Sequence, residues 1–150
     1  MDAMDLKILR ALQAEPDLSM AALADKVGLS HTPCWRRIKK LEADGVILKR
    51  ALLLDPKAVG LGVNVIAQLH FARQDEETLE AFENAVSKHP QIVECFSMSG
   101  ESDYLLRVVA QSIEDYEQFL KKIILHLPGV STVNSSFSLK TVKLTTDLPI

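Results

Sequence analysis

The feature that most constrains the fold is a pair of helical patterns joined by a short turn within the first 45 residues. Ser19 is a natural N-cap for the first helix of the pair, which places Leu23 and Val27 on one face and ends at Gly28. The second helix follows almost at once and is rich in arginine and lysine. Two helices joined by a tight turn that contains glycine, the second of them cationic, are typical of a helix-turn-helix unit that reads DNA.

The second helix of the pair has one apolar face and one cationic face. It begins at Ser30 or Thr32, because Pro33 then falls in the first turn, where an N–H would have no partner within the helix. At about 100° per residue, three apolar side chains fall within about 60° of one another and must face a core; they are Cys34, Ile38 and Leu41. From the opposite face and its flanks we predict the residues that contact DNA, namely Ser30, His31, Thr32, Trp35, Arg36, Arg37, Lys39 and Lys40.

The rest of the first part contains one more helix and an apolar run. The helix precedes the pair and stops near Glu15-Pro16, because proline disfavours helix in the residue before it. The apolar segment 46–54 predicts a strand, either a small wing or a connection to the next unit. The turn-rich segment 55–62 is the expected boundary. We therefore predict a DNA-binding domain over residues 1–60 and a second domain over residues 61–150.

The second part changes from a helical period to a mixture of strands and helices. The expected elements are a strand over 63–71, a helix opening in 75–83, strands over 92–98 and 104–110, a helix from Ser112 to a stop at Pro128-Gly129, and a strand from 130 to about 142. This order is that of the ferredoxin-like unit. The predicted fold class is α+β, with an N-terminal winged helix-turn-helix domain and a C-terminal ferredoxin-like (βαββαβ) domain.

One face of the predicted sheet is left without helices. The ferredoxin-like fold places both helices on the same side, so the apolar side chains of the strands cannot all lie under them. The candidates for the open face are Ile66, Cys95 or Phe96, Leu105 or Leu106, and Phe137. We expect this apolar surface to contact another copy of the chain.

Charge is divided unevenly between the two parts. The chain carries a net charge of −3 at pH 7. Residues 1–60 hold ten Lys/Arg against eight Asp/Glu, a net +2, whereas residues 61–150 hold seven against twelve, a net −5. The two parts are therefore expected to face different partners, and the cationic one is suited to nucleic acid.

Several other classes of protein are excluded by pattern. No segment is apolar enough to span a membrane, and the N-terminus lacks the basic and apolar regions of a Sec-type signal, so we expect no membrane partner. Two cysteines sixty residues apart form neither a disulfide framework nor a zinc site, which indicates a cytoplasmic location. They are expected to be small buried hydrophobes, with redox sensing as the alternative.

Catalytic motifs are also missing from the sequence. The segment from Gly60 to Val65 lacks the third glycine of a dinucleotide loop and precedes a strand. The four histidines show no metal-ligand spacing, and no nucleophile elbow or phosphate loop occurs. We therefore predict no enzyme activity, no catalytic residue, no metal site and no cofactor other than an effector.

The loop between the two central strands is a candidate ligand site. It combines Gly100, exposed hydroxyls and Asp103 next to Tyr104. Backbone N–H groups and a carboxylate in such a loop could bind the carboxylate and ammonium of a small zwitterion. The alternative is that Asp103 only shapes the hairpin and that Tyr104 only fills the strand.

At this point the residues resemble a known family over the whole chain. The stretches 5–9, 23–30 and 37–47 resemble the DNA-binding half of Lrp/AsnC regulators, and residues 99–106 resemble the amino-acid-binding loop of that family's effector domain. The resemblance implies a homodimer that pairs through its effector-domain sheets, is often assembled into an octamer, and controls transcription in response to an amino acid bound between dimers.

The resemblance also implies effector-binding positions. They are Met98, Gly100, Ser102, Asp103 and Tyr104 of one dimer, with Leu127, Pro128, Thr132, Val133 and Ser135 near the facing one. Ser102 replaces the commoner aromatic residue before the aspartate. The motif 32–35 and the tail 145–150 are most similar to a cysteine-responsive branch of the family, which makes L-cysteine the first choice of effector.

The sequence therefore predicts a sequence-specific, double-stranded-DNA-binding transcriptional regulator that responds to a small amino acid. Two alternatives remain open. One is an architectural DNA-binding protein of the same fold without an effector, and the other is an amino-acid-binding module whose helical half contacts protein.

Overall fold

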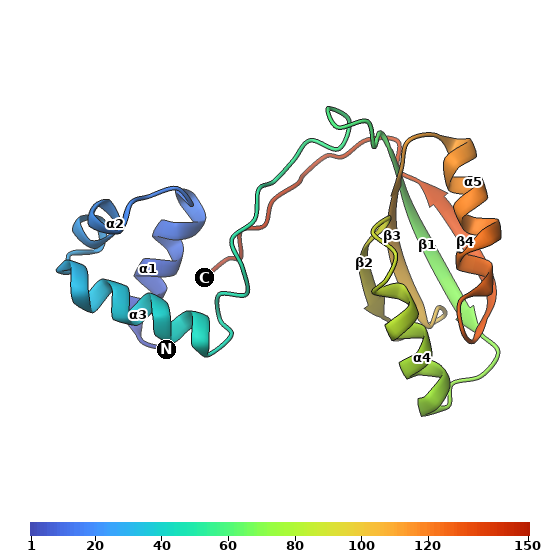
Figure 1. The fold of residues 1–150 in the computed structure, drawn as a ribbon, viewed down its shortest axis with the longest axis horizontal. Helices are drawn as coiled ribbons and strands as arrows, with labels where there is room; N and C mark the ends of the chain where they lie inside the picture. The colour runs from blue at the N-terminus through green and yellow to red at the C-terminus, as the bar shows by residue number, and fades with distance from the viewer. The chain divides into compact units, whose positions relative to one another are not determined.

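The computed structural model describes residues 1–150, which divide into two compact units (Figure 1). The first unit consists of Met1–Leu53 together with Val142–Ile150, and the second is Leu54–Thr141. Each unit has its own hydrophobic core.

The first unit contains three helices, α1 (Ala3–Ala14), α2 (Met20–Val27) and α3 (His31–Ala43). The apolar face predicted for α3 is confirmed, because Cys34, Ile38 and Leu41 are buried. Cys34 and Ile38 pack with Ile8 of α1 and Leu23 of α2 in one cluster. Full burial of an aliphatic side chain of this size contributes about 1.5 to 3 kcal/mol, so these contacts fix the three helices against one another.

The turn between α2 and α3 follows the sequence signals closely. Ser19 caps α2 by accepting a hydrogen bond from the N–H of Ala22. Gly28 ends the helix with φ at +78°, a left-handed conformation that side chains with a Cβ disfavour. Of the two predicted starts for α3, Ser30 is the N-cap, and Thr32 lies within the helix. These local signals leave only two residues between the turn glycine and the start of α3.

The strand predicted over 46–54 is wrong. The N–H groups of Val46 and Ile47 bond to the carbonyl of Leu41 and close α3, after which the segment joins no strand. Leu48 and Leu52 are 89% and 85% exposed. The residues have the composition of a strand, but a strand exists only when its backbone groups find a partner, and this chain offers none there.

The C-terminal tail of the chain packs against α1 within the first unit. Gln13 accepts a hydrogen bond from the N–H of Leu148 at 2.7 Å and donates one to its carbonyl at 3.0 Å. Arg10 donates to the carbonyl of Ile150 at 2.6 Å. Two side chains of α1 thus form hydrogen bonds with backbone N–H and carbonyl groups of the tail.

The second unit is a four-stranded antiparallel sheet with two helices on one side (Figure 1). Its elements are β1 (Val63–Phe71), α4 (Glu76–Val86), β2 (Ile92–Ser97), β3 (Tyr104–Ala110), α5 (Ile113–Lys122), a 3-10 turn η1 (Ile124–His126) and β4 (Val130–Phe137). The strand order β2-β3-β1-β4 confirms the ferredoxin-like fold. The last strand ends five residues earlier than the predicted position near 142.

Alternation along the strands separates the two faces of this sheet. Val65, Leu69 and Leu106 are fully buried against Phe82 of α4 and Tyr116 of α5. Of the side chains considered for the other face, Cys95 and Leu106 lie under the helices, and Phe137 packs edge-on against Tyr116 at 5.5 Å. The open face therefore keeps Ile66, Phe96 and Leu105, and Phe96 is 51% exposed.

The structure contains no helix with the length and hydropathy that crossing a bilayer requires.

Candidate nucleic-acid interface and ligand loop

The outward face of α3 carries most of the predicted DNA-contacting residues. Seven of them are exposed, namely Ser30, His31, Thr32, Trp35, Arg36, Lys39 and Lys40. Trp35 is 45% exposed, which is a large open surface for the only tryptophan of the chain. An exposed helix face of hydroxyls, cations and one aromatic ring can contact phosphates, base edges and a thymine methyl group.

The exposed cations of α3 differ in their partners. Lys39 pairs with Glu42 at 2.7 Å and Lys40 pairs with Asp44, both across one helical turn. The hydrogen bond to Asp44 raises the pKa of Lys40. Such exposed pairs contribute little to stability, so a phosphate can replace the carboxylate. Arg36 has no ion pair or hydrogen bond within the chain, and its donors are fully available.

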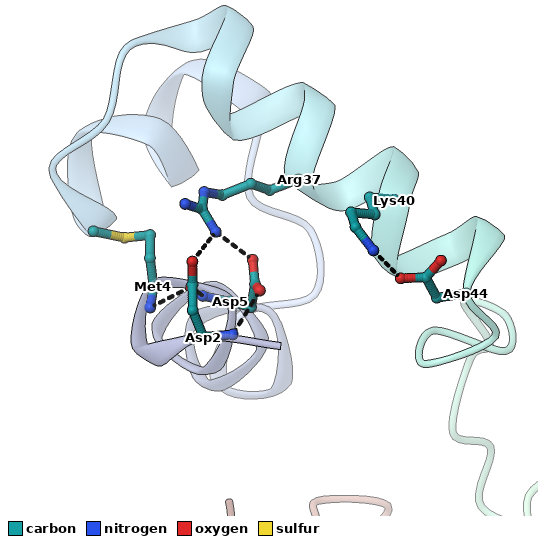
Figure 2. A network of polar contacts seen from close by, with 6 residues as sticks. All are labelled: Asp2, Met4, Asp5, Arg37, Lys40 and Asp44. Carbon is teal, nitrogen blue, oxygen red and sulfur yellow. Dashed lines mark hydrogen bonds and ion pairs between the residues drawn. The ribbon is translucent and has the colours of Figure 1, made fainter.

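Arg37 extends from α3 toward the start of α1 (Figure 2). Its Nη1 donates to Asp2 and to Asp5, each at 2.7 Å. The hydrogen bond between the helix backbone and each carboxylate lowers the pKa of both aspartates, and Arg37 lowers them further. The helical pattern predicts a DNA contact for Arg37 and does not reveal its two aspartate partners, although their Asp-x-x-Asp spacing is that of a capping box.

Asp2, Asp5 and Arg37 border a hollow in the surface of the first unit. It has a volume of about 570 Å³ and is lined by Met1, Asp2, Asp5, Pro33, Arg36, Arg37 and Lys40. Arg36 and Lys40 therefore sit at the rim of the same hollow as the two carboxylates.

In the second unit, Asp103 fastens the loop after β2 to the end of β1. Its Oδ2 accepts a hydrogen bond from the N–H of Phe71 at 2.7 Å, and its Oδ1 accepts one from Gln74. Its own N–H donates to the carbonyl of Leu69, and its carbonyl accepts from the N–H of Met98. All four contacts are structural, so Asp103 shapes this end of the sheet whether or not it also meets a ligand.

Tyr104 is buried beside the loop and not exposed within it. Its hydroxyl donates to Glu83 of α4 at 2.8 Å, and its ring stacks on Phe71 with centroids 5.2 Å apart. Burial, followed by the contact with Glu83, raises the pKa of Tyr104 to about 12. The phenol therefore stays protonated and donates its hydrogen bond to Glu83 at the surface of α4.

The second group of predicted effector residues begins at the same end of the sheet. Leu127 is buried and Pro128 is half-buried, and the carbonyl of Gly129 accepts from the N–H of Ala72 just beyond β1. Phe71 thus has the 98–104 loop on one side and the start of β4 on the other.

Farther along β4 the predicted effector residues turn to different faces. Thr132 is exposed, whereas Val133 packs on the core under the helices and Ser135 shares a hydrogen bond with Tyr116. One chain brings the loop and residues 127–130 together but does not gather all ten predicted positions into one pocket.

Both cysteines are free thiols set into apolar surroundings. Cys34 is fully buried in the first core, which raises its pKa. Burial, with a smaller contribution from Glu83, raises the pKa of Cys95 to about 11. Cys34 is the small buried hydrophobe expected from the sequence, whereas Cys95 is only partly buried against the second core.

Comparison with known families agrees with each half of this description. Residues 1–47 match the family described as winged helix-turn-helix DNA-binding, and residues 64–148 match the Lrp/AsnC ligand binding domain. The chain belongs to the Lrp/AsnC family of transcriptional regulators. Its predicted fold class is confirmed, and its relatives in this family are regulators and not enzymes.

Relatives of this Lrp/AsnC chain are similar along its whole length. The DNA-binding transcriptional activator DecR of Escherichia coli K12 is 39% identical over 150 residues, covering all of this chain and 99% of that protein. The glutamate uptake regulatory protein of Zymomonas mobilis is also 39% identical, covering all of this chain and 91% of that one.

Two solved structures are similarly close. A crystal structure of an AsnC family regulator from Agrobacterium tumefaciens is 48% identical with a TM-score of 0.91, covering 99% of this chain and 97% of that one. The complex of the regulator NMB0573 from Neisseria meningitidis with L-Met is 37% identical with a TM-score of 0.90, covering 99% and 96%.

Proposed function

We propose that this Lrp/AsnC protein is a sequence-specific regulator that binds double-stranded DNA through α3. We further propose that it responds to a small amino acid bound at the 98–104 loop, with L-cysteine as the first choice. The observation that carries the proposal is the exposed cationic face of α3, placed directly after the left-handed turn at Gly28. A helix presented in this way fits the major groove, where its cations meet phosphates and base edges.

The DNA contacts are tested by removing single cations. The binding constant K falls as salt is added, and we take the salt slope as the steepness of the fall of log K with log salt. Arg36→Ala and Lys40→Ala should each lower this steepness by about 1 if the partner is a phosphate. A base contact should instead cost about 1 to 3 kcal/mol of specific binding and relax specificity. Lys121→Ala on α5, which removes another exposed cation with an intrahelical ion pair, is the matched control. Unchanged affinity in both α3 variants would contradict the assignment.

The dimer proposal rests on the open face of the sheet. Ile66, Phe96 and Leu105 share this face with polar neighbours and are incompletely buried. A second copy of the chain, related by two-fold symmetry, would cover the same patch on both partners. Further assembly of dimers into an octamer would bring residues 127–135 of one dimer near the loop of another.

The effector proposal rests on the end of β1, which the 98–104 loop and residues 127–130 flank on opposite sides. The names of the relatives do not select one effector, because one regulator is named for glutamate uptake and another was solved with L-Met. L-cysteine is our first choice on the similarity of residues 32–35 and 145–150 to the cysteine-responsive branch.

Calorimetric titration with cysteine, serine, methionine and glutamate tests this choice. Asp103→Asn is the informative variant, because asparagine can still accept the hydrogen bond from Phe71 while losing the charge that would pair with a ligand ammonium. We expect the variant to lose amino-acid binding and the parent to show a change of about 1 to 3 kcal/mol in DNA affinity, reciprocal between the two ligands. If Asp103→Asn responds like the parent, the ligand binds elsewhere.

The same experiments distinguish the alternatives. DNA binding without heat from any amino acid would favour an architectural protein, and amino-acid binding without salt-dependent DNA binding would favour a module that contacts protein. A cysteine response that disappears in the Cys34→Ala/Cys95→Ala protein would indicate thiol chemistry instead of pocket binding.

A further inference from the structure

The first turn of α1 is built as a reciprocal capping box that has oxygens left over. Oδ1 of Asp2 accepts hydrogen bonds from the N–H groups of Met4 and Asp5, both at 2.9 Å. Oδ2 of Asp5 accepts from the N–H of Asp2 at 2.8 Å. Each carboxylate therefore uses one oxygen to cap the helix end and has a second oxygen that accepts no hydrogen bond from α1.

The two free oxygens converge on one nitrogen of α3. Oδ2 of Asp2 and Oδ1 of Asp5 both accept from Nη1 of Arg37 at 2.7 Å (Figure 2). The Asp5 side chain is only 14% exposed and that of Arg37 is 35% exposed, compared with 74% for Lys40. The capping box thus fixes the direction of a guanidinium on the helix proposed to read DNA.

We propose that Asp2 and Asp5 are positioning residues that hold Arg37 away from DNA and so determine which cations α3 offers to it. The inference rests on the proposed function. Asp2, Asp5 and Arg37 together carry a charge of −1, so these three groups by themselves offer a phosphate no net attraction, whereas Arg36 and Lys40, which line the same hollow, do. Arg36, at the preceding position of the same helix, is unpaired and remains the guanidinium that can contact DNA.

Specificity follows from this arrangement because phosphate contacts carry no sequence information. A free Arg37 would add a salt-dependent contact to every DNA sequence alike and would raise non-specific binding. An Arg37 held by α1 instead keeps α3 at one angle to the rest of the unit. The carboxylates thereby favour the specific complex over the non-specific one.

The test compares two neighbouring arginines by the salt dependence of DNA binding. The double variant Asp2→Asn/Arg37→Met removes one negative and one positive charge, so it conserves the net charge of the hollow, and asparagine remains a good N-cap. We expect its salt slope to equal that of the parent while its ratio of specific to non-specific affinity falls by roughly twofold to 150-fold, the size of coupling between contacting residues. Arg36→Met, the matched control, should lower the slope by about 1.

The converse variant frees Arg37 instead of removing it. Asp2→Asn/Asp5→Asn keeps one capping oxygen on each side chain but removes both negative charges that hold Arg37. We therefore expect the salt slope of this variant on non-specific DNA to become steeper by about 1, because Arg37 can then contact a phosphate. In that background, Arg37→Met should return the slope to the parental value. This second comparison decides the matter if circular dichroism shows that Asp2→Asn/Arg37→Met does not fold.

A slope that falls by about 1 in Asp2→Asn/Arg37→Met places Arg37 on a phosphate and overturns the inference. An unchanged slope in Asp2→Asn/Asp5→Asn overturns it as well. If the parent protein shows no salt-dependent DNA binding, the proposed function fails too, whereas normal binding by the parent with either of the former results defeats this inference alone.

Discussion

Glu83 of α4 acts on two weakly acidic side chains of the sheet, the buried Tyr104 and the partly buried Cys95. The hydroxyl of Tyr104 donates to it at 2.8 Å, and its negative charge also opposes ionisation of Cys95. Because burial is the larger cause for both groups, the thiol and the phenol are protonated at neutral pH.

The thiol of Cys95 should accordingly react slowly with alkylating reagents. Its pKa of about 11 lies above the pH of ordinary buffers, so at pH 8 only about one thiol in a thousand is ionised. In the Cys34→Ala protein, the rate of reaction with iodoacetamide should rise about tenfold per pH unit between pH 8 and 10.

A rate that reaches half of its maximum near pH 8.5 would show an ordinary thiol and contradict this expectation. Slow reaction would also mean that free cysteine does not form a mixed disulfide with Cys95 readily. A cysteine response would then have to come from binding in a pocket.

At the scale of the element, two glycines end or join elements for different reasons. Gly28 has φ at +78° with no atom within 4 Å of where a Cβ would lie. Gly129, which leads into β4, has φ at +80°, and a Cβ there would lie 2.5 Å from Thr78 and 2.9 Å from Phe71. The first position constrains only the backbone, whereas the second constrains the packing as well.

The two alanine substitutions should therefore differ in cost. Gly28→Ala should lower the free energy of unfolding of the first unit by about 1 to 2 kcal/mol, the cost of the left-handed backbone. Gly129→Ala should lower that of the second unit by about 2 to 4 kcal/mol, because Thr78 or Phe71 must also move. Urea denaturation measures both losses, with Gly62→Ala as a control at a position without positive φ. Equal losses at the two sites would contradict the role given to Thr78 and Phe71.

The elements that could be predicted from sequence are those specified by local signals. Ser19, Gly28 and Ser112 mark helix ends through hydrogen bonds with near neighbours, and alternation alone predicts β1. The segment 46–54 was predicted wrongly because strand formation depends on a partner that local composition does not report.

In the candidate site, too, features set by local signals could be predicted and contacts between distant residues could not. The helical period correctly separates the buried Cys34 from the exposed Arg36. It does not reveal that Arg37 meets Asp2 and Asp5, because that contact joins residues more than thirty positions apart in the sequence. The assignment of effector residues remains a prediction, and so do the domain limits 1–60 and 61–150.

At the scale of the whole molecule, symmetry makes a prediction about DNA sites. Each proposed dimer carries two copies of α3, and both can enter successive major grooves only when half-sites lie about 34 to 36 Å apart or at multiples of that spacing. Light scattering should give an even-numbered oligomer, and footprints should be phased with the helical turn of DNA. A monomer at micromolar concentration, or footprints without that phasing, would contradict the arrangement.

The contact of the tail with α1 changes what a deletion means in this protein. The first unit is discontinuous, since it draws on Met1–Leu53 and on Val142–Ile150 from the other end of the chain. Removing residues 142–150 would leave the whole sheet in place but would take from Gln13 and Arg10 the backbone groups that they bond. A stop codon placed after the last strand is therefore a mutation of the DNA-binding half, and its first measurable effect should be faster amide exchange in α1.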